Sequence, residues 1–317
     1  MEAEALPLNP RKRVCPACES ESSVAFLKAP DRFHGRNVSY DLRRCQSCSL
    51  VWVSDPPSPD ELGSHYGPDY HKAITTASET SPKRWESHKK SIARFKGGGS
   101  VLDIGCSSGS FLNSIKNSNW KLHGIEMSPD EAERARERTG AQVFVGDILN
   151  ADFPENSFDL VTSFDVLEHV YNPKDCMKKI AYWLKPGGVF YVFIPNIEAW
   201  EARFFSSYWF GLELPRHLCH FGPESLRKLT SRAGLSELSL STPRVTYAEY
   251  SIRYVYDESL RRMGFRREPL SAGNSVSFPW KVVRKLFRET ALSAFSYASS
   301  VSVRAAAIEG IFSKPGK

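Results

Sequence analysis

The chain of 317 residues lacks any run of about 18 apolar residues, the length that a membrane-spanning helix requires. Its first residues, MEAEALPLNPRKR, hold no apolar core followed by a cleavage site, so we expect no signal peptide and a cytoplasmic location. Charge of one sign is not in large excess either, because 42 Lys and Arg stand against 36 Asp and Glu, a net charge of +6. This balance permits contact with an anionic surface but does not indicate a nucleic-acid partner.

Cysteine is also sparse, and four of the seven cysteines form two C-x-x-C pairs near the N-terminus. Two intervening residues let both thiolates of a pair reach one ion at about 2.3 Å, and four thiolates close a tetrahedral shell. A redox dithiol would explain either pair alone, but two matched pairs in a reducing compartment favour metal. We therefore predict one structural zinc ion bound by Cys15, Cys18, Cys45 and Cys48.

The segments around these pairs indicate how the N-terminal part is organised. Residues 24–45 alternate enough to predict a β-hairpin, which makes residues 1–55 a zinc ribbon. Residues 56–80 are rich in Pro, Ser and Asp and predict a linker with one short helix near residues 58–66. Tyr66, Tyr70 and His71 in this segment can face the mouth of an active site, but ordinary packing is the favoured interpretation.

From about residue 81 onward, buried strands alternate with helices. This rhythm predicts an α/β fold with a doubly wound, mostly parallel sheet that is covered by helices on both faces. A ligand of such a sheet binds beyond the carboxyl ends of the strands. The predicted strands cover residues 100–105, 121–127, 141–147, 158–165 and 189–195, and the predicted helices cover 81–95, 108–118, 128–140 and 172–185.

The first of these strands runs into the glycine turn VLDIGCSSGS, residues 101–110, which lacks the middle glycine of a dinucleotide fingerprint. Ser107 stands in the middle of the turn, and Asp103 precedes the first glycine by two residues. A carboxylate there would repel a pyrophosphate but suits a cationic ligand. The ammonium and sulfonium groups of S-adenosylmethionine fit this requirement.

These residues and three later motifs resemble class I S-adenosylmethionine-dependent methyltransferases over residues 81–243, in the type 11/23-like group that includes the ubiquinone-biosynthesis O-methyltransferases. The resemblance implies that the acid and glycines of the first motif hold the methionine part of the cofactor. It also implies that Glu126 accepts both ribose hydroxyls and that Asp147 binds the adenine amino group. The full set of implied cofactor contacts is Asp103, Gly105, Cys106, Gly109, Glu126, Met127, Asp147, Ile148 and Phe164.

The chemistry is expected after the fourth strand, in SFDVLEHVYNP. In a helical turn, Asp165, Glu168 and His169 would share one face toward the methyl group. Three interpretations stay open: His169 is a general base, all three residues hold a divalent ion such as Mg²⁺, or Asp165 and Glu168 form a capping box beside a packed histidine. The resemblance to the quinone methyltransferases supports the first two.

A second group of candidates follows the fifth strand. Six large aromatic residues between 200 and 210 are too many for a solvated loop, so they either pack on the ribbon or form a lid. The nearby motif LPRHLCHFGPESL resembles bacterial methyltransferases that also carry N-terminal cysteine knuckles and often accompany surface-glycan or secondary-metabolite pathways. The predicted acceptor-binding residues are Tyr208, Arg216, His217 and His220.

The C-terminal part completes the predicted domain of residues 81–317. Residues 236–243 predict the sixth strand, and residues 306–315 predict the seventh, which in this fold returns antiparallel between the fifth and sixth. Residues 244–305 form a helical insertion, in which residues 279–299 are amphipathic with flanking Lys and Arg. That helix either packs on its own domain or makes a peripheral membrane contact.

The whole pattern predicts a methyltransferase that acts on a hydroxyl group of a sugar, a glycan precursor or another small metabolite. The chain lacks the Asn/Asp-Pro-Pro-aromatic motif shared by enzymes that methylate exocyclic amino groups of bases. Two alternatives remain, an RNA methyltransferase whose ribbon binds RNA and a scaffold that binds the cofactor without catalysis.

Overall fold

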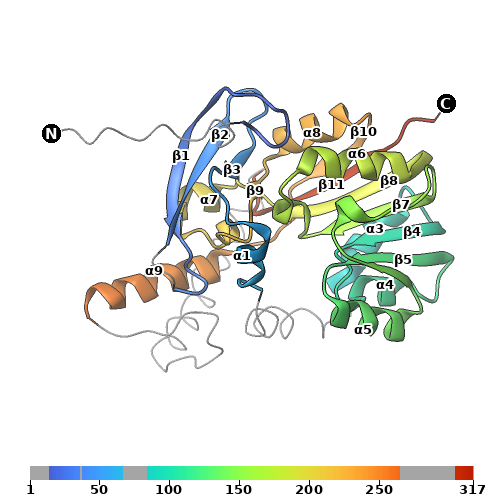
Figure 1. Ribbon diagram of the computed structural model, residues 1–317, viewed down its shortest axis with the longest axis horizontal. Coiled ribbons are helices and arrows are strands. Elements are labelled where there is room, and N and C mark those ends of the chain that lie inside the picture. Colours follow the sequence, from blue (N-terminus) through green and yellow to red (C-terminus); the bar gives the residue numbers. More distant parts are fainter. Residues whose placement is uncertain (1–13, 36–37, 67–83, 265–303, 317) are drawn as a thin grey trace.

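The computed structural model describes residues 14–35, 38–66, 84–264 and 304–316, which form two sheets lying side by side (Figure 1). The predicted amphipathic helix at residues 279–299 and most of the predicted linker lie outside the described residues. In the part of the chain that the structure describes, no helix combines the length and the apolar character needed to cross a membrane.

The larger sheet has seven strands in the order β10-β11-β8-β7-β4-β5-β6, which confirms the predicted fold class. β11 is antiparallel to both β8 and β10, and the other neighbours are parallel. The last strand therefore returns between the fifth and sixth, as predicted. The strands are β4 (Gly99–Ile104), β5 (Trp120–Glu126), β6 (Gln142–Val145), β7 (Phe158–Phe164), β8 (Leu184–Pro195), β10 (Ser236–Ser241) and β11 (Ala307–Ser313).

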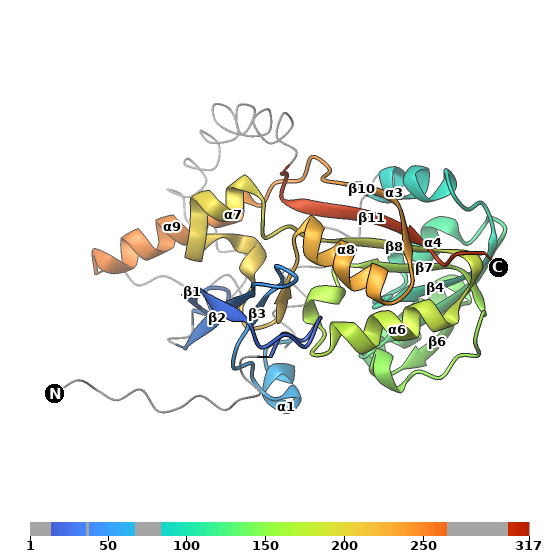
Figure 2. The same cartoon turned by 90° about the horizontal axis from the view of Figure 1, so that it is seen from above.

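Helices cover both faces of this sheet because successive strand residues point to opposite sides. Val101 of β4 packs in one apolar cluster with α3 (Arg84–Ala93), α4 (Ser110–Ile115) and α5 (Pro129–Thr139). The next residue, Leu102, packs in the opposite cluster with α6 (Pro173–Trp183) and α8 (Pro223–Arg232). Figure 2 shows α3 and α6 on opposite sides of the sheet.

The smaller sheet contains the predicted hairpin of β1 (Ser23–Pro30) and β2 (Ser39–Cys45), followed by β3 (Val51–Val53). Its fourth strand, β9 (Cys219–His220), comes from the region predicted to be the methyltransferase domain and pairs with Val51 and Trp52. Backbone hydrogen bonds therefore join the ribbon directly to the segment that follows the larger sheet's fifth strand.

One face of the small sheet is covered by the aromatic segment and by α9 (Ala248–Arg262). The aromatic segment consists of α7 (Trp200–Phe205), η4 (Ser206–Tyr208) and η5 (Phe210–Leu212). Phe205 and Trp209 are buried against the apolar side chains of β1, β2 and β3, whereas Phe204 is 70% exposed. Of the two predicted roles for the aromatic residues, packing on the ribbon therefore accounts for the buried ones. The predicted short helix is α1 (Pro59–Gly63), which begins with a capping box between Ser58 and Glu61.

Candidate active site

The glycine turn between β4 and α4 depends on backbone conformations that most side chains avoid. Gly105 and Gly109 have φ values of 69° and 74°, and a Cβ atom at Gly105 would lie 2.4 Å from Val166 Cγ2. Ser107 also has a positive φ of 47°, and its amide donates to Glu126 Oε2 at 2.9 Å. The turn thus brings the first predicted cofactor motif into contact with the second without a middle glycine.

Asp103 is the buried acid of this turn, with 3% of its surface exposed. Thr162 Oγ1 donates to Asp103 Oδ1 at 2.7 Å. Burial raises the pKa of the Asp103 carboxyl to about 7, the Thr162 hydrogen bond opposes this rise and the Glu126 charge adds to it. A cationic ligand stabilises the ionised form of such a buried carboxyl group. The methionine part of the cofactor would be a ligand of this kind.

The two other predicted acids occupy the ends of the neighbouring strands. Glu126 ends β5, and its Oε1 accepts from the amide of Ser128 at 2.9 Å. Asp147 follows β6 and caps η2 (Ile148–Asn150), with its Oδ1 accepting from the Leu149 amide at 2.7 Å. Each carboxylate keeps lone pairs for a ligand, since one oxygen can accept more than one hydrogen bond.

The remaining predicted cofactor contacts surround the same strand ends. Cys106 and Ile148 are buried, and Met127 is 70% exposed. Phe164 ends β7 and packs at 4.9 Å, centroid to centroid, against Trp85 of α3. The predicted contacts therefore follow the carboxyl ends of β4, β5, β6 and β7, where a sheet of this type binds its ligand.

The loop after β7 does not form the predicted helical face. Only Leu167–His169 is helical (η3), while Asp165 lies before it with a φ of 53°. The Asp165 side chain is 40% exposed and its Oδ2 lies 3.8 Å from Arg84. The predicted capping box is also wrong, because η3 begins after Val166 without any side-chain cap.

Glu168 instead points into the protein and is 1% exposed. Within the described residues, neither of its carboxyl oxygens has a hydrogen-bond partner. Burial raises the pKa of Glu168 well above its usual range, and the neighbouring Asp165 adds to the rise. His217 Nε2 lies 4.0 Å from Glu168 Oε1.

His169 has a defined tautomer because of its backbone contact. Its Nδ1 lies 3.0 Å from the carbonyl oxygen of Arg216 and 2.9 Å from the hydroxyl of Tyr66. The carbonyl can only accept, so Nδ1 carries the proton and Nε2 keeps the lone pair. Burial lowers the pKa of His169, which keeps the ring neutral near pH 7.

Three predicted acceptor residues, Arg216, His217 and His220, form a buried group with Glu213, a residue that the sequence analysis missed. The fourth, Tyr208, is half-buried and stacks on Arg32 instead. Arg216 Nε donates to Glu213 Oε1 at 3.0 Å. Burial opposes the charge of Glu213, but His217, the Arg216 guanidinium and His169 together outweigh it and hold the Glu213 pKa below its usual range. The i, i+3 spacing of Glu213 and Arg216 did not predict this ion pair, because such spacing brings side chains together on a helix and residues 214–216 form a turn.

The two predicted histidines differ in their distance from the η3 loop. His217 Nδ1 donates to the Gly211 carbonyl at 3.0 Å, and its ring meets that of His169 at 4.7 Å and 82°. Burial lowers the pKa of His217 to about 3. His220 lies in β9 and donates from Nε2 to the Leu212 carbonyl at 3.0 Å, 6.2 Å from the His217 ring. The structure thus brings His217, rather than Asp165, together with Glu168 and His169.

Three groups of side chains in the described part of the chain have metal-ligand spacing. The predicted cysteines form one, with Sγ–Sγ distances of 3.5 Å for both Cys15–Cys48 and Cys18–Cys45. An ion with bonds of about 2.3 Å needs edges of about 3.8 Å, so four thiolates this close fit a tetrahedral metal. The other two groups are Glu168, His169 and His217, and Asp31, His34 and His65.

The second of these groups corrects the predicted magnesium set. Asp165 is not a member, and His217 takes its place. Two imidazoles with one carboxylate suit zinc or iron better than magnesium, which prefers oxygen ligands. The third group was not predicted, because Asp31 and His65 are far apart in sequence and meet only when α1 packs beside the β1–β2 hairpin.

Comparisons with known proteins agree with this architecture. Residues 79–240, about half of the chain, match the family model described as "Methyltransferase domain". The Ubiquinone biosynthesis O-methyltransferase of Idiomarina loihiensis is 28% identical over 156 residues, which cover 45% of this chain and 64% of that protein. The "Probable tRNA methyltransferase 9B" of Mus musculus is 29% identical over 154 residues, 47% of this chain and 34% of that protein. The chain thus spans between about a third and two thirds of the length of these relatives.

Solved structures share the fold at low sequence identity. Phosphoethanolamine N-methyltransferase 2 of Haemonchus contortus, in complex with S-adenosyl-L-methionine, is 18% identical with a TM-score of 0.53, covering 84% of this chain and 62% of that one. The [4+2]-cyclase SpnF is 17% identical with a TM-score of 0.54, covering 83% of this chain and 98% of that one. The matched family model and the arrangement of the cofactor motifs show that this chain belongs to the class I S-adenosylmethionine-dependent methyltransferases.

Proposed function

We propose that this chain transfers a methyl group from S-adenosylmethionine to a hydroxyl group of a sugar, a glycan precursor or another small metabolite, with His169 as the general base. The observation that carries the proposal is the His169 tautomer, in which the Arg216 carbonyl holds the Nδ1 proton and Nε2 keeps its lone pair. This imidazole stands at the carboxyl end of β7, next to the strands whose ends carry the cofactor motifs.

The residues at the ends of β4, β5 and β6 are suited to bind S-adenosylmethionine. Asp103 is buried, no cation among the described residues acts on its carboxyl group, and the small Ser107 leaves the turn free of a bulky side chain. Asp103 would hold the cationic methionine end, Glu126 the ribose hydroxyls, and Asp147 the adenine amino group. When bound, the cofactor supplies an electrophilic methyl group on a sulfonium.

The protein's part in the reaction is alignment and proton transfer. Methyl transfer is an in-line displacement, so the acceptor oxygen must be held close to the methyl carbon while its proton leaves. His169 Nε2 takes that proton, and the ring can do so because burial lowers its pKa and keeps it neutral. The Glu213 carboxylate lies close enough to stabilise the imidazolium that forms.

The four cysteines would hold a structural zinc ion that orders the ribbon. Cys219 of β9 packs in the same buried cluster as Cys15, Cys45 and Cys48, and the adjacent Leu218 amide donates to the Glu168 carbonyl at 2.8 Å. An ordered ribbon therefore supports the position of the η3 loop. This arrangement favours a ribbon that builds the acceptor site over one that serves as a separate RNA-binding module.

The identity of the acceptor is not transferred from the relatives, because their names include both tRNA and ubiquinone-biosynthesis methyltransferases. A hydroxyl acceptor is supported by the neutral histidine, since a base is required to remove a hydroxyl proton. The magnesium alternative loses Asp165, while Glu168, His169 and His217 keep the spacing for a different ion.

The test replaces His169 with Ala and measures S-adenosylmethionine affinity and methyl transfer separately. We expect the affinity to stay within about twofold and turnover to fall by about 10²- to 10⁴-fold, the usual contribution of a general base. Added imidazole should restore part of the turnover. Tyr171→Phe is the control, because the Tyr171 hydroxyl bonds the Pro57 carbonyl at the surface. Unchanged turnover in His169→Ala would remove the base from the mechanism.

A further inference from the structure

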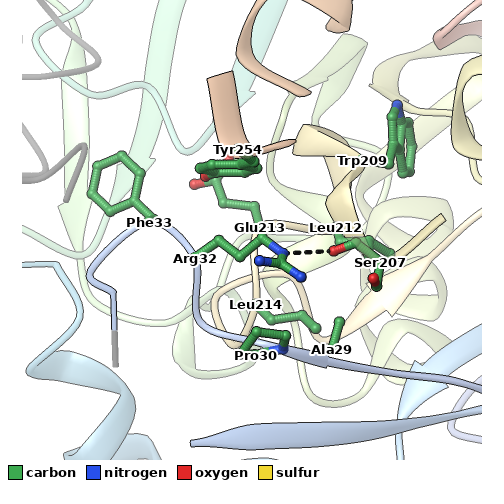
Figure 3. A pocket seen from close by; sticks show the side chains of 10 residues that line it. All are labelled: Ala29, Pro30, Arg32, Phe33, Ser207, Trp209, Leu212, Glu213, Leu214 and Tyr254. Carbon is green, nitrogen blue, oxygen red and sulfur yellow. Dashed lines mark hydrogen bonds between the residues drawn. The ribbon is translucent and has the colours of Figure 1, made fainter. Parts of the chain in front are cut away.

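A small pocket that is partly open to solvent lies beside the acceptor group, between the end of β1, the turns η4 and η5, and α9. Figure 3 shows Arg32 reaching across it toward Ser207. The pocket is lined by Ala29, Pro30, Arg32, Phe33, Ser207, Trp209, Leu212, Glu213, Leu214 and Tyr254. Most of these are apolar, so Arg32 and Glu213 determine which polar group the pocket can take.

Arg32 is a half-buried cation without an ion pair among the described residues. Its Nε donates to the Ser207 carbonyl at 3.0 Å, and its guanidinium stacks on the Tyr208 ring at 3.7 Å. Burial lowers the pKa of Arg32, as expected for a guanidinium whose charge is not fully compensated. The two Nη nitrogens keep the planar, two-pronged geometry that binds carboxylates and phosphates.

The carboxylates near Arg32 are already engaged. Glu213 lines the pocket, but its Oε1 accepts from the Arg216 guanidinium at 3.0 Å. Glu258 acts on Arg32 electrostatically from α9, and its carboxylate accepts from Arg261 and Arg262 at 2.9 Å and 3.1 Å. Arg32 therefore has the capacity for an additional anion.

Glu213 also links the pocket to the proposed chemistry. Glu213 lines the pocket, its Oε2 lies 3.6 Å from His217 Nε2, and the His217 ring contacts that of His169 at 4.7 Å. A group bound at Arg32 would thus lie close to the residues that contact the proposed base. A metal ion does not suit this place, because the guanidinium would repel it.

We propose that this pocket binds an anionic group of the methyl acceptor, a phosphate or a carboxylate, through the two Nη nitrogens of Arg32. The inference rests on the proposed function and deepens it, because it restricts the acceptor to hydroxyl compounds that carry such a group. Tyr208 contributes by holding the guanidinium plane, which gives the predicted acceptor-binding residue a positioning role.

The test titrates the full-length protein with inorganic phosphate, pyrophosphate and acetate in a calorimeter. We expect saturable binding of at least one of these anions, and Arg32→Gln should weaken it by about 10-fold or more, since a bidentate, charge-assisted contact is lost. Arg227→Gln is the matched control, because Arg227 pairs with Glu237 on the exposed side of α8. Preference for the phosphates or for acetate identifies the source of the anionic group.

Two results would overturn the inference: none of the three anions binds, or Arg32→Gln binds them as well as the unchanged protein. If Arg32→Gln does not fold, Arg32→Lys keeps the charge and loses the two-pronged geometry, and it should still weaken binding severalfold. The outcome is separate from the proposed function. Anion binding that depends on Arg32 in a protein without methyl transfer would contradict the proposed function alone.

Discussion

The affinity for S-adenosylmethionine should depend on pH through Asp103. Burial raises the pKa of this carboxyl to about 7 in the free protein. The cationic end of the cofactor stabilises the ionised form, so binding should return the pKa toward its ordinary value of 3.8. Binding then releases a proton, and affinity rises with pH until Asp103 is ionised in the free protein as well.

The size of this effect follows from the two pKa values. Between pH 5 and pH 7.5 the affinity should increase by about 70-fold, or about 2.5 kcal/mol, and flatten above pH 7. At pH 6, about 0.9 proton should be released for each cofactor molecule bound. Calorimetry in buffers with different ionisation enthalpies measures both quantities at each pH.

Asp103→Asn provides the decisive comparison, since an amide does not titrate. We expect this variant to bind more weakly at pH 7.5 and to lose the pH dependence between pH 5 and 7.5. Asp41→Asn is the control, because the Asp41 side chain is 64% exposed on the ribbon. An affinity that is constant over this range in the unchanged protein, or a pH dependence that survives in Asp103→Asn, would refute the reasoning.

Two further predictions concern the ribbon and the glycine turn. Metal analysis should find one zinc ion per chain. Cys48→Ser should lose the metal and lower the thermal unfolding temperature, because structural zinc binding supplies the folding free energy of such ribbons. A native protein that contains no metal would contradict this prediction. Gly105→Ala should lower the free energy of unfolding by at least about 2 kcal/mol, because its Cβ would meet Val166 Cγ2 at 2.4 Å in addition to the positive φ. Gly140 also has a positive φ, of 72°, but a Cβ atom there would meet nothing within 4 Å, so Gly140→Ala should lower the free energy of unfolding by only about 1 kcal/mol. If denaturant titrations show equal losses for the two variants, the clash with Val166 is excluded.

The sheet and the cofactor motifs could be predicted because their signals are local. Apolar strands alternate with helices along the chain, which predicts a parallel sheet covered on both faces. The place of the last strand was expected from the resemblance to the methyltransferase family. Asp103 lies near the end of β4, Glu126 ends β5 and Asp147 follows β6, so their places depend only on those strands. The paired cysteines are similarly informative, because two residues between ligands already define one side of a metal site.

The acceptor site could be predicted only in part, because contacts distant in sequence assemble it. The short segment of residues 165–169 was expected to form one helical face, but the positive φ of Asp165 turns that residue away and His217 joins Glu168 and His169 instead. β9 is only Cys219–His220, too short to show a strand pattern, and it forms by pairing with β3. The pocket around Arg32 depends on the same tertiary packing of ribbon, turns and α9.

The most direct test of the account supplies labelled S-adenosylmethionine and the purified protein to a fractionated extract of a strain that lacks the gene. We predict that label enters an anionic small-molecule or glycan-precursor fraction as a methyl ether, which stays attached in mild alkali, whereas a methyl ester would release methanol. Label confined to the RNA fraction, or label in none of the fractions, would contradict the proposed transfer to a small-molecule hydroxyl.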